Sequence, residues 1–175
     1  MAATHLSLVN QKLAYLRSIL SQLESIDPEQ RGTTMATRAL VDAGLFHLNV
    51  AYQFYLRELA EVNRLKTCAD IYSLTQLKAR LDALGRSPSE VQELCVLTGQ
   101  PESWLAMMLS AYEAIFLSPP PVLELKAFPV HENAIPLIDV TAATAIRVYS
   151  PSDLAAASQA FIALIGRQRE TSAEY

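Results

Sequence analysis

The 175-residue sequence has little of what most recognisable chemistries require. It holds only two cysteines, three histidines and five glycines. Two cysteines are too few for a disulfide framework, and Cys68 and Cys95 lack the paired spacing of metal ligands. We therefore expect two free thiols in a reducing compartment.

Long apolar runs and clusters of positive charge are also missing. No stretch reaches the ~18 uncharged apolar residues that a membrane span needs. The first 20 residues lack the basic start and unbroken apolar run of a signal peptide. A net charge of −4 does not fit the basic surface of a nucleic-acid-binding protein. We expect a cytoplasmic protein that binds neither membrane nor nucleic acid.

The motifs of common enzymes are absent as well. The sequence contains no Gly-x-Ser-x-Gly, no glycine-rich phosphate loop and no Glu-x-x-His. His5 and His131 have no second ligand three or four positions further on. We accordingly assign no catalytic residue, no metal site and no cofactor, and favour a protein that is not an enzyme.

What the sequence does have is helical periodicity over most of its length. Hydrophobic residues make up 51%, and leucine and alanine dominate them. This predicts one all-α domain over residues 1–175, an antiparallel helical bundle with one long central helix. The expected helices are residues 4–26, a second that begins between Pro28 and Thr34 and ends near Lys66, a short one after Ser73, residues 91–98 after a Ser87-Pro88 cap, residues 101–117, and residues 151–170.

Two segments do not fit this pattern. Prolines divide residues 119–150 but apolar residues recur there, which indicates an irregular, ordered connection before the last helix. Residues 171–175 form a short tail that we expect to fray.

The central helix is apolar on nearly every face, as a buried helix would be. On a helical wheel, Asp42, Asn49 and Gln53 form one narrow polar seam. We expect this seam to face water. If it is buried instead, a second subunit or the proline-rich segment is the expected cover. Arg57 and Glu61 are spaced to form an ion pair within the helix.

His47, opposite the seam, is the most suggestive single residue. One hypothesis places a ligand pocket beside His47, Tyr52, Tyr55 and Glu58. His47 and Glu58 project in similar directions but lie three turns apart, roughly 16 Å, so they cannot share one ion. The alternative is that His47 is a core residue with a hydrogen-bond partner and that the two tyrosines fill the core.

Three short stretches and the chain end carry a resemblance. Residues 10–15 (NQKLAY), 43–48 (AGLFHL) and 164–170 (LIGRQRE), with the final Glu174-Tyr175, are similar to a family of small all-helical proteins from pseudomonad-type bacteria, catalogued as a domain of unknown function. The resemblance implies an all-α cytoplasmic protein and brings no activity or site residue with it. Two functions therefore stay open: a protein that acts through a homo-oligomer or another protein partner, and a small-molecule-binding bundle or cryptic enzyme with its pocket near His47.

Overall fold

The computed structural model describes residues 4–26, 35–117 and 149–173. All regular structure in these residues is helical, so the prediction of an all-α protein is confirmed. None of the described helices is long and apolar enough to cross a membrane. The elements are α1 (His5–Ser25), α2 (Met35–Val62), the 3-10 turn η1 (Cys68–Asp70), α3 (Leu74–Asp82), α4 (Ser89–Gly99), α5 (Trp104–Ala114) and α6 (Pro151–Ala173).

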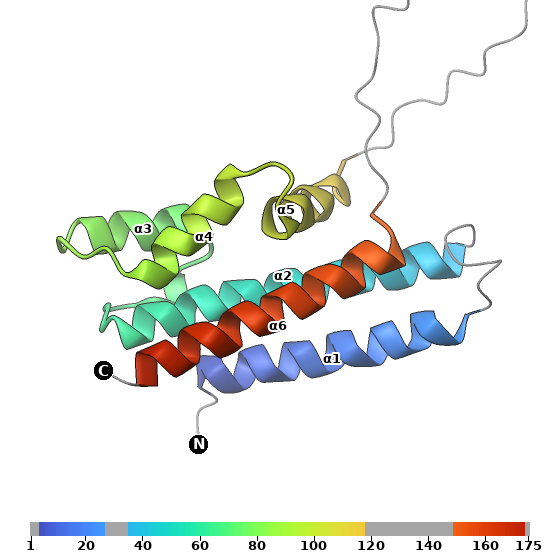
Figure 1. Cartoon of the computed structure of the whole chain (residues 1–175), viewed down its shortest axis with the longest axis horizontal. Coiled ribbons are helices and arrows are strands. Elements are labelled where there is room, and N and C mark those ends of the chain that lie inside the picture. Colours follow the sequence, from blue (N-terminus) through green and yellow to red (C-terminus); the bar gives the residue numbers. More distant parts are fainter. Residues whose placement is uncertain (1–3, 27–34, 118–148, 174–175) are drawn as a thin grey trace, which may run out of the picture.

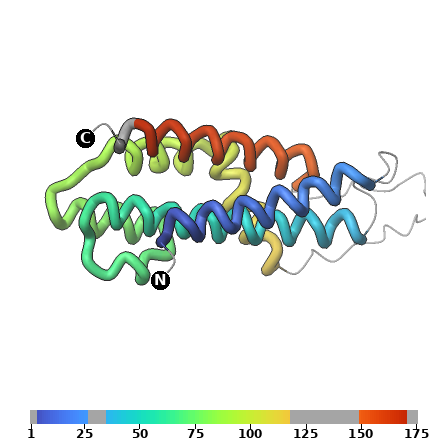
Figure 2. The backbone as a smooth tube through the Cα atoms, turned by 90° about the horizontal axis from the view of Figure 1, so that it is seen from below, coloured from blue at the N-terminus to red at the C-terminus, as the bar shows by residue number. Residues whose placement is uncertain are grey.

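α1 and α2 lie side by side and run in opposite directions (Figures 1 and 2). Two ring contacts show the alignment: the His5 ring stacks on Phe54 with centroids 6.4 Å apart, and Tyr15 meets His47 edge to face at 5.4 Å. Residue numbers therefore rise along one helix as they fall along the other. The expected leucine stripe of α1 supplies its buried side, through Val9, Leu13, Leu16 and Leu23.

α6 covers the groove between α1 and α2, but it runs parallel to α2 (Figure 1). Near the start of both helices, Leu154 occupies the space in which a side chain on Gly44 would lie. Further along, Tyr52 meets Phe161. The antiparallel order expected of the bundle thus describes α1 and α2, whereas α2 and α6 form a parallel pair. α6 buries one apolar stripe, formed by Leu154, Ala157, Phe161, Leu164 and Ile165.

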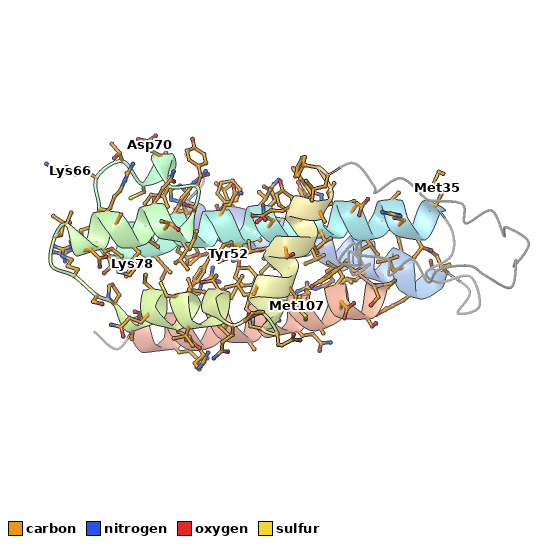
Figure 3. All side chains as sticks on the ribbon, turned by 90° about the horizontal axis from the view of Figure 1, so that it is seen from above. Met35, Tyr52, Lys66, Asp70, Lys78 and Met107 are labelled. Carbon is orange, nitrogen blue, oxygen red and sulfur yellow. The ribbon has the colours of Figure 1, made fainter. Side chains whose placement is uncertain are left out.

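The three short helices form a second layer over α2 and α6 (Figure 1). α5 packs against both long helices and crosses α2 steeply (Figure 3). Its buried residues are Leu105 and Met108, while Trp104 lies against Phe161 of α6 with ring centroids 6.0 Å apart. α4 lies between α3 and α5, so this layer places α4 beside the final turns of α6.

Most helix ends follow the local rules read from the sequence. The Thr4 hydroxyl accepts from the Ser7 amide, and the Ser73 hydroxyl accepts from the Gln76 amide. Ser150 and Asp153 cap each other reciprocally before α6, with Pro151 in the first helical position.

α2 ends earlier than expected, at Val62 rather than near Lys66. Arg64 adopts the left-handed conformation at φ 54, and the Leu65 amide returns to the Ala60 carbonyl at 2.9 Å. This is a Schellman ending, which glycine normally provides. No glycine marks this ending, so the sequence pattern did not predict it. At the end of α3, Gly85 has φ +65 and fills the same role as expected.

Two helix starts differ from the prediction. α4 begins at Ser89, two residues before the expected start at Val91, and the Ser87 oxygens accept from the Gln92 side chain instead of capping the backbone. α5 begins at Trp104, because the Ser103 hydroxyl accepts from the Ala106 amide and forms the cap. At the other end of the chain, α6 continues to Ala173, past the expected onset of fraying. The expected start of the second helix and nearly all of the 119–150 connection lie outside the described residues.

Candidate functional site

Tyr52 and Tyr55 project from the inner side of α2 into the core. Their exposed fractions are 3% and 1%, and both rings meet Phe161 edge to face. Figure 3 places Tyr52 on the side of α2 that faces α4 and α6. Burial raises the pKa of both hydroxyls well above the usual range, so both stay protonated. The packing favours the core-filling interpretation of these two tyrosines.

A polar network joins the inner side of α2 to α4 and α6. The Tyr55 hydroxyl donates to Gln168 Oε1 at 2.5 Å, and Gln168 Nε2 donates to Glu93 Oε2 at 2.7 Å and more weakly to the Glu90 carbonyl. Arg167 donates to the other Glu93 oxygen at 2.6 Å. Burial would raise the pKa of the Glu93 carboxyl, but the Gln168 and Arg167 hydrogen bonds outweigh it and hold this pKa below the usual range.

Glu58 belongs to the same end of the protein. Although only 7% exposed, it accepts a two-pronged ion pair from Arg169, with Nε–Oε1 at 2.7 Å and Nη2–Oε2 at 2.8 Å. Arg169 also donates to Asn10 of α1 at 3.3 Å. Although Arg169 lies near the end of α6, it is not a fully solvated side chain, because the parallel course of α6 brings it over α2.

His47 lies on the other side of α2, against α1. Its ring is enclosed by Tyr15 and Phe46, both edge to face, and Nδ1 is buried without a hydrogen-bond partner. Burial lowers the pKa of His47, and the nearby Lys12 ammonium lowers it further. The hydrogen bond expected for a core His47 is therefore absent at Nδ1.

The four residues of the hypothetical ligand site do not converge. His47 packs on α1, while Tyr52, Tyr55 and Glu58 pack on α6. Three surface hollows of the described chain, of about 130, 120 and 400 Å³, are lined by other residues. Within the described residues, no three His, Cys, Asp or Glu side chains gather closely enough to hold a metal ion. A shared ligand site stays a prediction, and these contacts weigh against it.

The polar seam of α2 does not face water as expected. Asn49 is only 3% exposed, and Asp42 and Gln53 are half-buried. α5 packs against α2 and crosses it (Figure 3). The position of α5 could not be read from a helical wheel, since a wheel gives relative directions and not the identity of the neighbours.

The side of α2 that is left open is apolar. Phe46 is 48% exposed and is the most exposed large side chain on this part of the helix. We call this surface the outer stripe; its spacing of three or four residues keeps it on one side of the helix. Its members are Ala39, Ala43, Phe46, Val50 and Phe54, all exposed or half-buried.

Arg57 continues the outer stripe as a fixed cation. Its guanidinium lies 5.2 Å from the Phe54 ring centroid and 4.9 Å from that of Tyr72, and Nε donates to the Ile71 carbonyl at 2.9 Å. Glu61 lies 2.7 Å from His5 Nδ1 of α1. The ion pair expected between Arg57 and Glu61 therefore does not form, because each side chain has a partner on another element.

Comparison with known proteins supplies the family and no activity. Comparisons with curated proteins and with solved structures found no match. A family model does match, over residues 1–175, and it is described as a family of unknown function. This confirms the resemblance seen in the sequence, whereas the expected bacterial source stays a prediction. The chain belongs to the family of unknown function DUF6586.

Proposed function

We propose that this protein acts by protein–protein interaction and that the outer stripe of α2 is the surface it uses. The supporting observation is the exposure of Phe46 within an apolar helix face whose other members are exposed or half-buried, beside a core that buries polar side chains. Exposed apolar patches of this kind mark interaction sites in soluble proteins. We place the protein in the cytoplasm, in agreement with its two free thiols.

The surroundings of the outer stripe support binding of a protein rather than of a small molecule. The stripe extends along several turns of α2, and the three hollows described above lie elsewhere on the surface. Small ligands prefer concave sites that enclose them. A long, flat helix face instead suits a second helix, whose side chains can pack between its residues.

Self-association is the simplest form of this proposal and can be tested on the purified 175-residue chain. Sedimentation velocity over a wide range of concentrations measures the oligomeric state. We expect reversible association that Phe46→Glu abolishes. The matched control is Val96→Glu, which adds the same charge to an apolar position on α4 that is 58% exposed and should leave association unchanged.

Two results would argue against this surface. Equal loss of association in both variants would point to a general effect of added charge. A chain that stays monomeric at the highest concentration would exclude self-association. Far-UV circular dichroism of each variant shows that the helices have been retained.

A further inference from the structure

Arg57 is a half-buried cation that several contacts hold in one position. Its guanidinium carbon lies 5.2 Å from the centre of the Phe54 ring and 4.9 Å from that of the Tyr72 ring, and its Nε donates to the Ile71 carbonyl at 2.9 Å. The backbone of this second contact is itself fixed, because Ile71 is fully buried and the Tyr72 amide donates to Gln76 Oε1 at 2.8 Å. The guanidinium of Arg57 is therefore oriented before any ligand arrives.

The charge of Arg57 is not neutralised by the part of the chain that the structure describes. In those residues, its two terminal nitrogens, Nη1 and Nη2, make no hydrogen bond or ion pair. The two nearest acidic residues along α2 are bonded elsewhere, since Glu58 pairs with Arg169 and Glu61 lies 2.7 Å from His5 Nδ1. An oriented guanidinium is thus left with two donor groups that are available to a ligand.

We propose that Arg57 is a binding site for a carboxylate group. A guanidinium presents its N–H groups in a rigid planar fork, and the two oxygens of a carboxylate match this fork. Because the Ile71 carbonyl occupies Nε, the carboxylate binds through Nη1 and Nη2. The inference goes beyond the proposed function, since a carboxylate on a free molecule can occupy Arg57 when no protein covers the outer stripe.

The charges near Arg57 favour a carboxylate over a phosphate. Glu61 lies one turn further along α2, and 47% of its side chain is exposed. It therefore adds negative potential beside the site, although His5 contacts it. A carboxylate carries one negative charge, whereas a phosphate group carries up to two and is repelled more strongly by Glu61.

The fixed orientation of Arg57 should raise its affinity for a carboxylate. A mobile arginine side chain loses rotamer freedom when it binds, and this loss lowers its affinity. At Arg57 the ring contacts and the hydrogen bond to Ile71 have already removed much of that freedom. Arg17 of α1 provides the comparison, because it is exposed and makes no hydrogen bond or ion pair within residues 4–26, 35–117 and 149–173.

The position of Arg57 also suits a carboxylate that belongs to a protein. On the helical wheel of α2, Arg57 projects between Phe46 and Val50, so it lies on the same face as the outer stripe. It is eleven residues from Phe46, or roughly 16 Å along the helix axis. A helix that lies along the stripe with an apolar residue over Phe46 would reach Arg57 with the residue eleven positions away. An Asp or Glu at that position supplies the carboxylate.

Titration with acetate tests the site on the ¹⁵N-labelled 175-residue chain. NMR follows the Nε–Hε signals of Arg57 and Arg17 while sodium acetate replaces sodium chloride at constant ionic strength. We expect the half-saturating acetate concentration to be at least about tenfold lower at Arg57 than at Arg17, because Arg57 loses less side-chain freedom. Equal responses at the two arginines would overturn the proposal, since Arg57 would then behave as an ordinary surface cation.

Two variants separate the planar fork from the positive charge. Arg57→Lys keeps the charge but has no fork, so acetate should no longer produce a saturable change at the Tyr72 amide. Binding as tight as in the wild type would overturn the proposal. Tyr72→Leu keeps Arg57 and its bond to Ile71 but removes one ring, and it should raise the half-saturating concentration at the Arg57 signal. This second variant decides the question if Arg57→Lys unfolds the chain. Arg17→Lys is the matched control and should leave the Tyr72 change unaltered.

Further titrations identify the anion and its source. Inorganic phosphate that binds Arg57 more tightly than acetate would overturn the assignment to a carboxylate. A helical peptide with leucine and glutamate eleven positions apart is compared with the same peptide carrying glutamine. Tighter binding of the glutamate peptide than of acetate and the glutamine peptide supports a carboxylate from a protein. Equal binding of the two peptides, with acetate binding retained, supports a carboxylate on a free molecule. These results do not depend on the association that Phe46→Glu tests, so the two proposals can fail separately.

Discussion

The two sides of α2 differ from the usual pattern, because the inner side buries polar side chains and the outer side exposes an apolar one. On the inner side, a carboxylate and two tyrosines are buried, with Glu58 only 7% exposed. On the outer side, Phe46 is 48% exposed. Free energy explains the inner side: a buried charge is tolerated where its partner and hydrogen bonds are supplied, as Arg169 does here. Within the described residues, no helix covers the outer side as α6 covers the inner side.

This difference shows what the inner network contributes. Apolar contacts alone would let α6 slide or turn on α2, since many registers bury similar areas. The hydrogen bond from Tyr55 to Gln168 and the ion pair of Glu58 with Arg169 are both satisfied in one register only. The network therefore fixes the register and the parallel orientation of α6 on α2. The outer stripe has no polar contacts of this kind that would fix the register of a partner.

Among substitutions on the inner side, loss of an apolar core contact should lower the free energy of unfolding most. Phe161 is fully buried and touches the rings of Tyr52, Tyr55 and Trp104. We expect Phe161→Ala to lower the free energy of unfolding by about 3–5 kcal/mol, because it removes a large side chain and leaves a cavity. Urea denaturation followed by circular dichroism measures the change. The neighbouring Ile162, 42% exposed, is the control, and Ile162→Ala should cost less than about 1 kcal/mol.

Removal of the buried charge should have the next largest effect. Glu58→Ala leaves the Arg169 guanidinium without its carboxylate in a partly buried position, with 27% of that side chain exposed. We expect a loss of about 2–3 kcal/mol, toward the lower end for a broken buried pair because water reaches part of the arginine. Glu61→Ala, one turn further on and paired with His5, should cost at most about 0.5 kcal/mol. Equal losses at the two positions would contradict the role of Glu58 in fixing the register of α6.

Tyr55 and Tyr52 form a matched pair for the hydrogen-bond network. Tyr55→Phe removes the hydroxyl that donates to Gln168, and we expect a loss of about 1 kcal/mol. The Tyr52 hydroxyl is buried and has no hydrogen-bond partner in the structure, so Tyr52→Phe should be neutral or slightly stabilising. The two variants differ by the same single oxygen, which makes chemical denaturation a direct comparison. A larger loss at Tyr52 would mean that its hydroxyl is bonded in solution.

The sequence was sufficient for the helices because their signals are local. The leucine spacing of α1 and the reciprocal cap of Ser150 and Asp153 depend on residues within a few positions of each other. The errors occurred where a local signal was missing or duplicated. The left-handed ending of α2 at Arg64 contains no glycine that would predict it. At the start of α4, both Ser87 and Ser89 are residues that can cap a helix, so the sequence did not identify the first residue.

The sides of α2 could not be read in the same way. Burial of Asn49 and exposure of Phe46 follow from how other helices pack on α2, and two of these, α5 and α6, are distant from it in the sequence. The network had a weak signal, namely a Glu on a mostly apolar helix and two arginines near the chain end, but their pairing spans 111 residues. Glu58 and Arg169 meet because α6 runs parallel to α2, and no local sequence pattern predicts that direction.

His47 borders the outer stripe through its contact with Phe46, and its titration offers the smallest and most specific test. Burial and then Lys12 lower its pKa in the folded chain, while the unfolded chain keeps a value near 6.5. The neutral ring is thus favoured by folding, so this stability is complete above pH 6.5 and is lost as the pH falls through 6.5 toward the folded pKa. His47→Gln should flatten the pH dependence of unfolding between pH 7.5 and 5.5, by less than the effect of Tyr55→Phe. Lys12→Ala should flatten it partly.

If a second copy covers the stripe, His47 becomes more deeply buried, and the wild-type slope should steepen with protein concentration while that of Phe46→Glu stays constant. A slope independent of concentration in a chain that does dimerise would place the interface away from His47.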